Sequence, residues 1–384
     1  MVVNTCKNTL YFKSNLRFRK LPIGAYCVHI VSKDTSIGTM RGTTLNLHNR
    51  FETRSTEAFD DGWDKLEEDL QLLVVQTEFI PDQTKSIVSY NDSPDLPMMA
   101  SINPYRGCEH GCAYCYARPS HEYLGYNSAL DFETKILVKH NAHELLRKEM
   151  MKPSWKPQVI ALSGNTDCYQ PVERKLGITR RILEVCLEFK NPVAIITKNV
   201  VALRDIDILS EMAKLDLVMM NFSITTLDLH LSRKLEPRTA APLRKLDAMR
   251  KLTDAGIPCG VNNAPIIPGL NDDETPKILE SAADAGAISA GFIIVRLSYG
   301  NKDIFADWLR RNVPMEADKV LKRIMMVRDG KLNETQFGTR MKGEGAYADF
   351  IKQQFKVYCR KYHLNEKPFH LSTEHFQRPG MLFG

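Results

Sequence analysis

The middle of the chain alternates short apolar runs with longer amphipathic stretches, and this pattern constrains the fold most. Six runs have the length and apolar content of buried strands: residues 98–102, 158–162, 192–197, 217–222, 258–263 and 290–296. Helical patterns lie between several of them, at residues 133–151, 179–189, 241–255 and 274–285. Strands that alternate with helices form βα units around a parallel sheet. We therefore predict an α/β fold, an open or partial barrel of six βα units with its active site at the carboxyl ends of the strands.

Three further segments flank this central zone of residues 98–300. Residues 1–40 form a basic head, and residues 41–97 are a polar lead-in with one expected helix around residues 63–75. Residues 301–384 have helical and then irregular patterns. We expect the lead-in to pack on the barrel, and the last segment to be a helical C-terminal extension.

The basic head accounts for the net charge of the chain. Residues 1–33 hold six basic side chains and no acidic one, and the whole chain carries a formal charge of +6, so the remainder is neutral. A basic arm is weak support for nucleic-acid binding. The head is interpreted as a flexible tail; a targeting segment and translated sequence upstream of the true start remain alternatives.

The composition indicates a cytoplasmic protein with metal or redox chemistry. We find no run of roughly 18 apolar residues that could cross a bilayer. The start lacks the apolar core and small-residue cleavage site of a signal peptide. The chain has nine cysteines. In an intracellular protein, cysteines favour metal or redox sites over disulfides.

Three of the cysteines follow the first predicted strand directly. Cys108, Cys112 and Cys115 lie in the run G-C-E-H-G-C-A-Y-C-Y of residues 107–116. Thiolates bind soft metals and iron–sulfur clusters. Three ligands for a cubane of four irons would leave one iron open to an external ligand. Gly107 and Gly111 permit the tight backbone that such a loop needs.

Two other interpretations of this run remain open. His110 lies inside the loop and would complete a Cys3His zinc site on paper. A zinc clip usually needs a second two-ligand knuckle, and we see none downstream. The third interpretation is three unrelated buried thiols. We favour the cluster.

The run resembles the signature of radical S-adenosylmethionine enzymes, C-x3-C-x-aromatic-C, with Tyr114 as the aromatic residue. The wider stretch of residues 101–118 is similar to the uncharacterised bacterial relatives of spore photoproduct lyase, a DNA repair photolyase-like subgroup. Features of that subgroup recur at residues 91–95, 130–135, 166–171 and 337–340. The likeness runs from about residue 41 to the C-terminus and leaves out the basic head.

The resemblance implies a partial (β/α)6 barrel that carries a [4Fe-4S] cluster on Cys108, Cys112 and Cys115. It implies reductive cleavage of S-adenosyl-L-methionine (SAM) to a 5′-deoxyadenosyl radical, which abstracts hydrogen from an unknown substrate. Nucleic acid is one candidate for that substrate. A reductant such as flavodoxin or ferredoxin is expected as partner. The alternative is a non-catalytic iron–sulfur or zinc module that binds nucleic acid.

The resemblance also implies cofactor-binding residues at the strand ends. These are Tyr114, Ser163, Asn165, Thr166, Asp167, Lys198, Ser223, Thr225, Arg238 and Asn263. Residues 163–167 stand where the family often has Gly-Gly-Glu, and Asn165 and Asp167 have the alternative of capping the next helix. Lys198 resembles a cofactor-holding lysine of spore photoproduct lyase. Arg238 suits the cofactor carboxylate or a substrate phosphate.

One departure concerns the hydrogen donor. Spore photoproduct lyase uses a cysteine at the end of strand two, where this sequence has Gly164. The nearest thiol is Cys168, which is a candidate catalytic donor, with a buried free thiol as the favoured alternative. The spore lesion is therefore not carried over as substrate.

The basic segment 233–251 is interpreted as a solvated helix face.

Overall fold

The computed structural model describes residues 4–6, 9–11, 41–51, 76–96 and 98–380. The chain forms two compact units, of which the smaller comprises Met1–Thr39 and Phe59–Val74. Its described part is one antiparallel pair, β1 (Asn4–Cys6) with β2 (Thr9–Tyr11). The rest of the basic head and the helix expected around residues 63–75 lie outside the described residues. The flexibility of the head therefore stays a prediction.

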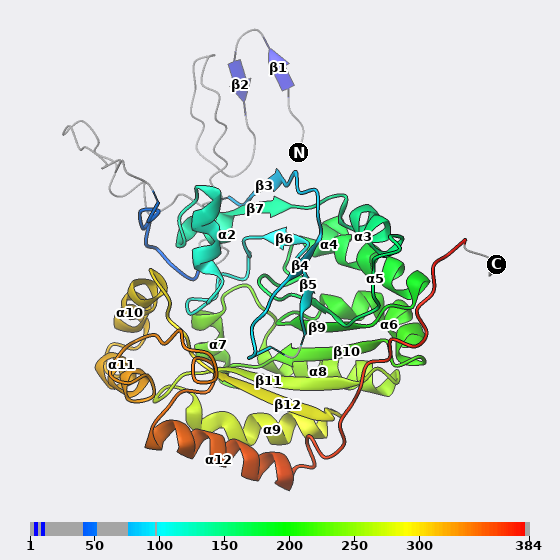
Figure 1. Cartoon of the computed structure of the whole chain (residues 1–384). Coiled ribbons are helices and arrows are strands. Elements are labelled where there is room, and N and C mark those ends of the chain that lie inside the picture. The colour runs from blue at the N-terminus through cyan, green and yellow to red at the C-terminus, as the bar shows by residue number, and fades with distance from the viewer. Residues whose placement is uncertain (1–3, 7–8, 12–40, 52–75, 97, 381–384) are drawn as a thin grey trace. The chain divides into compact units, whose positions relative to one another are not determined.

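The larger unit is built on an open sheet of seven strands in the order β12-β11-β10-β9-β8-β5-β4 (Figure 1). The strands are β4 (Val88–Tyr90), β5 (Ala100–Ile102), β8 (Ile160–Leu162), β9 (Val193–Thr197), β10 (Val218–Ser223), β11 (Cys259–Ile266) and β12 (Ser289–Ile294). Neighbours pair in parallel except β4, which is antiparallel to β5. The six parallel strands are the six predicted from the apolar runs. The α/β fold with a parallel sheet is confirmed, and the sheet does not close into a barrel.

Helices follow these strands because their apolar residues recur at helical spacing. In α5 (Ile178–Phe189), Ile182, Val185, Cys186 and Phe189 are all buried and form one face against the sheet. The other helices around the sheet are α4 (Glu173–Leu176), α6 (Ile206–Ala213), α7 (Leu229–Leu235), α8 (Pro242–Asp254) and α9 (Thr275–Asp284), with the 3₁₀ turns η2 (Val201–Asp205) and η3 (Asp272–Glu274). The helical patterns at residues 179–189, 241–255 and 274–285 therefore match real helices.

The single helix predicted over residues 133–151 is wrong. The chain forms α2 (Leu130–Thr134), the strand β7 (Lys135–Val138) and then α3 (Ala142–Met150). Strand β7 pairs in parallel with β3 (Glu78–Pro81) and antiparallel with β6 (Tyr105–Arg106) in a separate three-stranded sheet. The side chains of β7 alternate between half-buried and buried, which is the period of a strand and not of a helix.

The C-terminal segment contains three helices up to residue 361 and is irregular beyond it. It contains α10 (Asn301–Asn312), α11 (Ala317–Met326) and α12 (Ala346–Lys361), and α12 packs beside α9 (Figure 1). Side chains of α10 and α11 share a hydrophobic cluster with Cys112 and Tyr114 of the cysteine run, which is followed by the 3₁₀ turn η1 (Arg118–Leu124). Within the described part of the chain, no helix has the length and apolarity to cross a membrane.

Candidate active site

The three predicted cluster ligands lie on one loop that follows β6. Cys108 and Cys112 are each 7% exposed and Cys115 is partly exposed, and none of them is in a disulfide. Burial raises the pKa of all three thiols, and the negative charges of Asp167 at Cys108 and of Glu236 at Cys112 raise it further, followed by those of the neighbouring cysteines. As thiolates they would need a shared cation, which is the situation of a metal-cluster site.

Two glycines allow this loop its path. Gly107 and Gly111 have φ of +81° and +65°, in the region that disfavours other residues. A Cβ at Gly107 would lie 2.9 Å from the carbonyl oxygen of Lys135, and one at Gly111 would lie 2.6 Å from Glu133 Oε2. The loop is therefore packed too closely against α2 and β7 for a side chain at either position.

A fully buried ion pair packs against the cysteine loop and holds its backbone. Arg118 Nη2 lies 2.5 Å from Glu133 Oε1, and both side chains are 0% exposed. Arg118 also donates from Nε and Nη2 to the carbonyl oxygen of Cys112, at 3.1 and 2.9 Å. Glu133 Oε2 accepts the backbone N–H of Gly42 at 2.9 Å. One carboxylate thus connects the cysteine loop to the lead-in segment.

A second network fixes the first turn of the loop. The side-chain oxygen of Gln170 accepts the Glu109 N–H at 2.9 Å, and its amide nitrogen donates to the Gly107 carbonyl at 3.2 Å. The Glu109 carboxylate accepts the Val172 N–H at 2.7 Å and pairs with Arg238 at 2.8 Å. The predicted cofactor residue Arg238 therefore already has a carboxylate partner, and its role toward a ligand stays a prediction.

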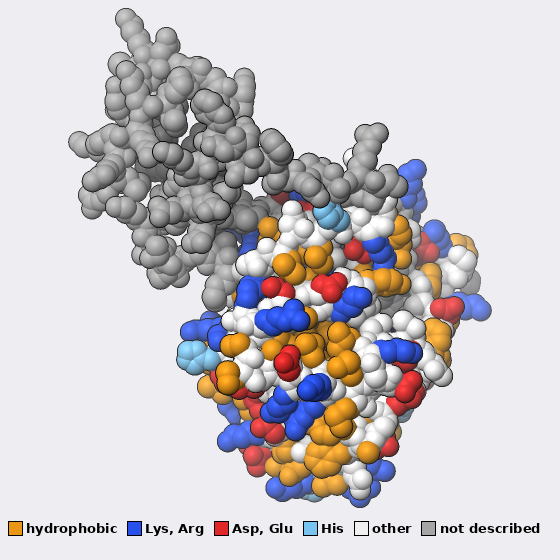
Figure 2. Space-filling view, turned by 90° about the vertical axis from the view of Figure 1, so that its left-hand side faces the viewer, with side chains coloured by type: hydrophobic (Ala, Val, Ile, Leu, Met, Phe, Trp, Pro, Cys, Tyr) orange, Lys and Arg blue, Asp and Glu red, His pale blue; other side chains and the backbone are white. Residues whose placement is uncertain are grey.

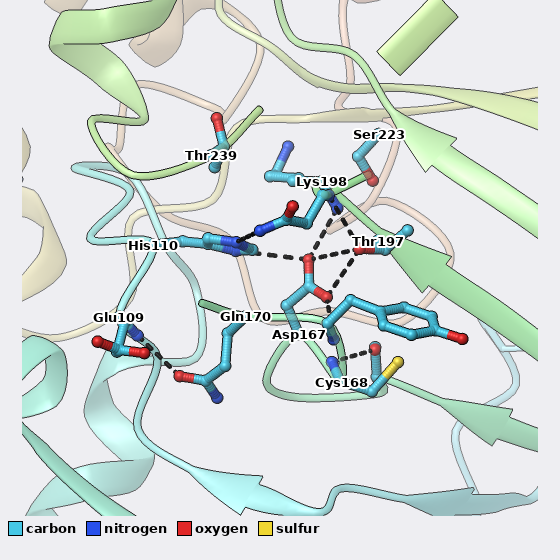
Figure 3. Close-up of polar contacts among 12 residues, drawn as sticks. Glu109, His110, Asp167, Cys168, Gln170, Thr197, Lys198, Ser223 and Thr239 are labelled. Carbon is cyan, nitrogen blue, oxygen red and sulfur yellow. Dashed lines mark hydrogen bonds and ion pairs between the residues drawn. The ribbon is translucent and has the colours of Figure 1, made fainter. Parts of the chain in front are cut away.

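His110 does not join the cysteines in a metal site. Its Nδ1 lies 3.4 Å from Asp167 Oδ2 and its Nε2 lies 3.2 Å from Asn199 Nδ2, so both ring nitrogens are engaged elsewhere (Figure 3). Burial lowers the pKa of His110 to about 4. Among the described residues, no three His, Cys, Asp or Glu side chains converge as they would on a single metal ion. The Cys3His zinc interpretation therefore lacks its fourth ligand.

The segment after β8 contributes a carboxylate to the same region. Asp167 accepts hydrogen bonds from Thr197 Oγ1 at 2.9 Å, the Lys198 N–H at 2.7 Å and the Tyr169 N–H at 2.8 Å (Figure 3). Together with His110, these contacts tie the ends of β8 and β9 to the cysteine loop. Asp167 does not cap a helix, because α4 begins at Glu173 without a side-chain cap.

The other predicted residues of this segment mainly hold its backbone. Ser163 has a φ of +77°, and its hydroxyl accepts the Cys168 N–H at 2.8 Å. Thr166 is buried and donates to the Tyr105 carbonyl at 2.7 Å. Asn165 is partly exposed and its amide nitrogen lies 3.1 Å from Ser120 Oγ, so it also has no capping role.

A buried triad of charges lies beside the loop. Glu236 pairs through Oε1 with Lys198 at 2.9 Å and through Oε2 with Lys245 at 3.0 Å, and it accepts hydrogen bonds from Tyr114 and Thr225. Burial acts to raise the pKa of Glu236, but the two lysines hold it far below its ordinary value. Two cations against one anion give the triad itself a formal net charge of +1. Lys198 is 16% exposed, so it is the member that a ligand can reach.

Sequence reasoning missed Glu236 and Lys245 as site residues. Lys245 was assigned to a solvated helix face, but its side chain is 1% exposed. The exposed ion pair of Lys251 with Asp247, at 2.8 Å, shows that other positions of α8 do face solvent. The helical spacing of the apolar residues in α8 was the available signal, because it places Lys245 next to the buried Leu246 and Met249.

The strand ends farther along the sheet are more enclosed. Ser223 and Thr225 are 6% and 1% exposed, and Thr225 Oγ1 lies 3.2 Å from Lys198 Nζ. Asn263 is fully buried, with its amide nitrogen donating to the Ile224 carbonyl and its oxygen accepting from Thr275 Oγ1. In this structure Asn263 therefore supports the backbone and is not accessible to a ligand.

Cys168 is fully buried in the main hydrophobic core. Its carbonyl accepts a hydrogen bond from Thr179 Oγ1 at 2.6 Å, and burial strongly raises the pKa of its thiol. This placement favours the alternative of a structural thiol. A role as hydrogen donor stays a prediction.

The comparison with known proteins points to the same part of the chain. Residues 102–282 match the family model of the radical SAM superfamily. These residues, just under half of the chain, form a domain of this superfamily. The matched region begins at the last residue of β5 and ends inside α9, so it contains the cysteine loop and the ends of β8 to β11.

The curated proteins that the chain resembles in sequence bear the name of uncharacterised proteins. A protein of Mycobacterium tuberculosis (strain ATCC 25618 / H37Rv) is 35% identical over 221 residues, which is 57% of this chain and 65% of that protein. One of Methanocaldococcus jannaschii is 29% identical over 173 residues, 45% of this chain and 62% of that protein. The chain thus spans just under two thirds of the curated relatives that it matches.

Solved structures of spore photoproduct lyase share the fold. One mutant superimposes with a TM-score of 0.53 at 15% identity, over 74% of this chain and 79% of that chain. A second mutant, solved with AdoMet and a dinucleoside spore photoproduct, has a TM-score of 0.52 at 16% identity, over 74% and 78%.

The superfamily implies a [4Fe-4S] cluster and SAM. The donor set fits the cluster, since three free thiols share one tightly supported loop. Cys108, Cys112 and Cys115 would hold it. The partly exposed ammonium group of Lys198 would suit the carboxylate of the cofactor.

Proposed function

We propose that this protein is a radical SAM enzyme that generates a carbon-centred radical for hydrogen abstraction from its substrate. The observation that carries the proposal is the three-thiol loop at the carboxyl ends of the parallel strands, next to a buried, net positive lysine–glutamate triad. Sites of α/β folds form at this edge of the sheet. A loop that supplies three thiolates to a cubane leaves one iron for the cofactor.

When bound, the reduced cluster would supply an electron to the sulfonium of SAM, and SAM would supply a 5′-deoxyadenosyl radical with methionine as the leaving group. The chain's own residues hold and orient these groups. Lys198 offers a cation to the cofactor carboxylate, and Glu236 fixes the position of its ammonium group. Tyr114 belongs to the loop, and its hydroxyl is held by hydrogen bonds with Glu236 and Thr225. The buried walls exclude water from a reactive intermediate.

The substrate is a separate question. The structures of spore photoproduct lyase share only the fold with this chain, and Cys168 is fully buried in the core. Gly164, at the position of that donor by the sequence comparison, carries no thiol. We therefore propose the superfamily chemistry without the spore lesion, with nucleic acid as one substrate class to test.

The electron donor is proposed to be a flavodoxin or ferredoxin of the cytoplasm. Low-potential carriers of this kind suit a cluster that must reduce a sulfonium. Reduced thiols and exposed iron are also best preserved in a reducing compartment.

The alternative is a non-catalytic module that binds nucleic acid through its cluster domain. Such a module usually has a contiguous basic surface. On the face displayed in Figure 2, basic side chains are interspersed with acidic and hydrophobic ones.

The proposal is tested on protein reconstituted with iron and sulfide without oxygen. Wild-type protein should hold about four irons and four sulfides. The electron paramagnetic resonance signal of its reduced cluster should change when SAM is added, because the cofactor occupies the open iron. Cys108→Ala, Cys112→Ala and Cys115→Ala should each lose the cluster.

Cys186→Ala is the matched control. It removes a buried thiol of α5, far in sequence from the loop, and should retain iron and the spectral response. A triple variant of the loop cysteines that keeps the cluster would overturn the assignment of ligands. A cluster whose signal ignores SAM would favour the non-catalytic module.

A further inference from the structure

Two arginines, Arg296 and Arg340, lie near the edge of the sheet that is formed by β12. Arg296 follows β12 by two residues, and Arg340 comes from the loop between α11 and α12. Arg340 pairs with Asp95 at 2.5 Å and donates to Ser93 Oγ at 2.5 Å. Asp95 also accepts the backbone N–H of Gly338 at 2.7 Å. Both oxygens of the nearby carboxylate are thus committed.

Arg296 lacks a comparable partner among the residues that the structure describes. Its Nε is buried without a hydrogen-bond partner, and the one hydrogen bond of its guanidinium runs from Nη1 to Met341 Sδ, at 3.6 Å. Burial and the positive charge of Arg340 lower its pKa. A partly buried cation beside a second cation is costly unless an anion completes the arrangement.

This pair lies close to the cysteine loop. Asn301, five residues after Arg296, donates from Nδ2 to the carbonyl oxygen of Cys115 at 2.9 Å. The hydroxyl of Tyr116 donates to the Gly164 carbonyl at 2.6 Å, at the end of β8, and Tyr116 acts electrostatically on Arg296. The arginines therefore border the region where a substrate must approach the radical.

Two exposed aromatic rings flank the guanidinium groups. Tyr116 is 50% exposed, and Phe337 is 53% exposed with Arg340 lying 4.3 Å from its ring centre. Large aromatic side chains at the surface of a site provide flat faces for stacking. Cations together with rings suit a ligand that has both a phosphate and a planar base.

We infer that Arg296 and Arg340 bind the phosphate of a nucleotide substrate. The inference rests on the proposed function and specifies its substrate class. Arginine forks match phosphate oxygens with paired hydrogen bonds, and a phosphate would satisfy the buried Nε of Arg296 and neutralise the pair. Arg328 is not part of this site, because its guanidinium is bound to the carbonyls of Ile294, Val295 and Arg340.

The shared chemistry has two sources, a free nucleotide and the backbone of a nucleic acid. Binding is measured on the reconstituted full-length protein by fluorescence anisotropy. The probes are a fluorescein-labelled 12-nucleotide single-stranded DNA, the RNA of the same sequence, and a fluorescein-labelled adenosine nucleotide. Unlabelled AMP and inorganic phosphate serve as competitors.

Arg296→Gln should weaken binding of the preferred probe roughly tenfold or more, as expected for hydrogen bonds to a charged group. Arg296→Lys should restore only part of it, because the fork is lost. Arg250→Gln, at an exposed position of α8, removes the same charge and should change binding less than twofold. For a nucleic-acid ligand, each lost phosphate contact should also reduce the salt dependence of binding.

Equal binding by wild type, Arg296→Gln and Arg250→Gln would overturn the inference, as would absence of binding to all three probes. Loss of SAM binding in Arg296→Gln, with probe binding unchanged, would assign the arginine to the cofactor and overturn it too. Iron content and circular dichroism of each variant show that the fold is intact. The proposed function fails separately, if wild-type protein makes no 5′-deoxyadenosine from SAM.

Discussion

The buried ion pair under the cysteine loop yields a quantitative prediction. Glu133→Gln keeps the shape of the side chain and removes its charge. Glu133 now accepts from Arg118 through one oxygen and from the Gly42 N–H through the other. An amide has one oxygen only, so its NH2 group must face one of these donors. The variant leaves Arg118 buried, at 0% exposure, without a counter-charge.

Removal of one partner from a fully buried ion pair costs roughly 3–5 kcal/mol. The exposed pair of Arg147 with Glu188 provides the matched control, because these side chains are 47% and 35% exposed. Glu188→Gln makes the same chemical change and should cost less than about 1 kcal/mol.

Anaerobic urea unfolding, followed by far-ultraviolet circular dichroism, measures both variants. The midpoint of Glu133→Gln should fall by roughly 1 M or more, while that of Glu188→Gln should stay close to wild type. Since Arg118 also holds the Cys112 carbonyl, Glu133→Gln should in addition retain less iron after reconstitution. Equal midpoints for the two variants, or a wild-type midpoint for Glu133→Gln, would refute this account of the loop.

Three other predictions concern single side chains. Burial lowers the pKa of His121 to about 4, so the unfolded chain binds more protons between about pH 4 and 6.5, and folding stability falls as the pH drops through that window. His121→Phe should therefore remove about 2 kcal/mol of the stability difference between pH 7 and pH 5, measured from urea midpoints. Glu236→Gln leaves two buried lysines without a carboxylate, and it should lower both thermal stability and the affinity for SAM measured by equilibrium dialysis. Cys168→Ala should leave cofactor cleavage intact. If the thiol is structural, turnover of the substrate, once found, should be unchanged as well, whereas stalled turnover would make it the donor.

The sequence was sufficient to predict the six parallel strands of the sheet, because each appears as a compact apolar run. Most of these strands are largely buried, whereas β12 is mainly half-buried. The sequence was not sufficient for residues 133–151. The run K-I-L-V of β7 lies between two helical stretches, and it becomes a strand by pairing with β3, more than fifty residues upstream in the chain. The local periodicity of the sequence carries no information about a strand pairing between segments so far apart in the chain.

The candidate site was predictable where the chemistry resides in the spacing of residues. The three cysteines share one loop, and Asp167 and Lys198 lie at adjacent strand ends, as expected. Partners that depend on tertiary packing were not predictable. Lys245 belongs to a basic helix segment in the sequence, and only the packing of α8 onto the sheet brings its ammonium group to Glu236.

Arg238 is a second case in which tertiary packing, and not the sequence pattern, decides the partner of a side chain. A guanidinium after strand four suited a cofactor carboxylate on chemical grounds, but the fold brings the Glu109 carboxylate to 2.8 Å from it. Residue type and position indicate which groups are suitable for a ligand. They do not indicate which groups the protein has already paired.

The central claim is tested most directly by the products formed from SAM. Reconstituted protein is reduced with dithionite or flavodoxin without oxygen, and 5′-deoxyadenosine and methionine are quantified by chromatography and mass spectrometry. The account predicts that wild-type protein forms both in equal amounts, and that the triple variant Cys108→Ala, Cys112→Ala, Cys115→Ala forms neither. Intact SAM after incubation with a fully loaded, reduced cluster would contradict it.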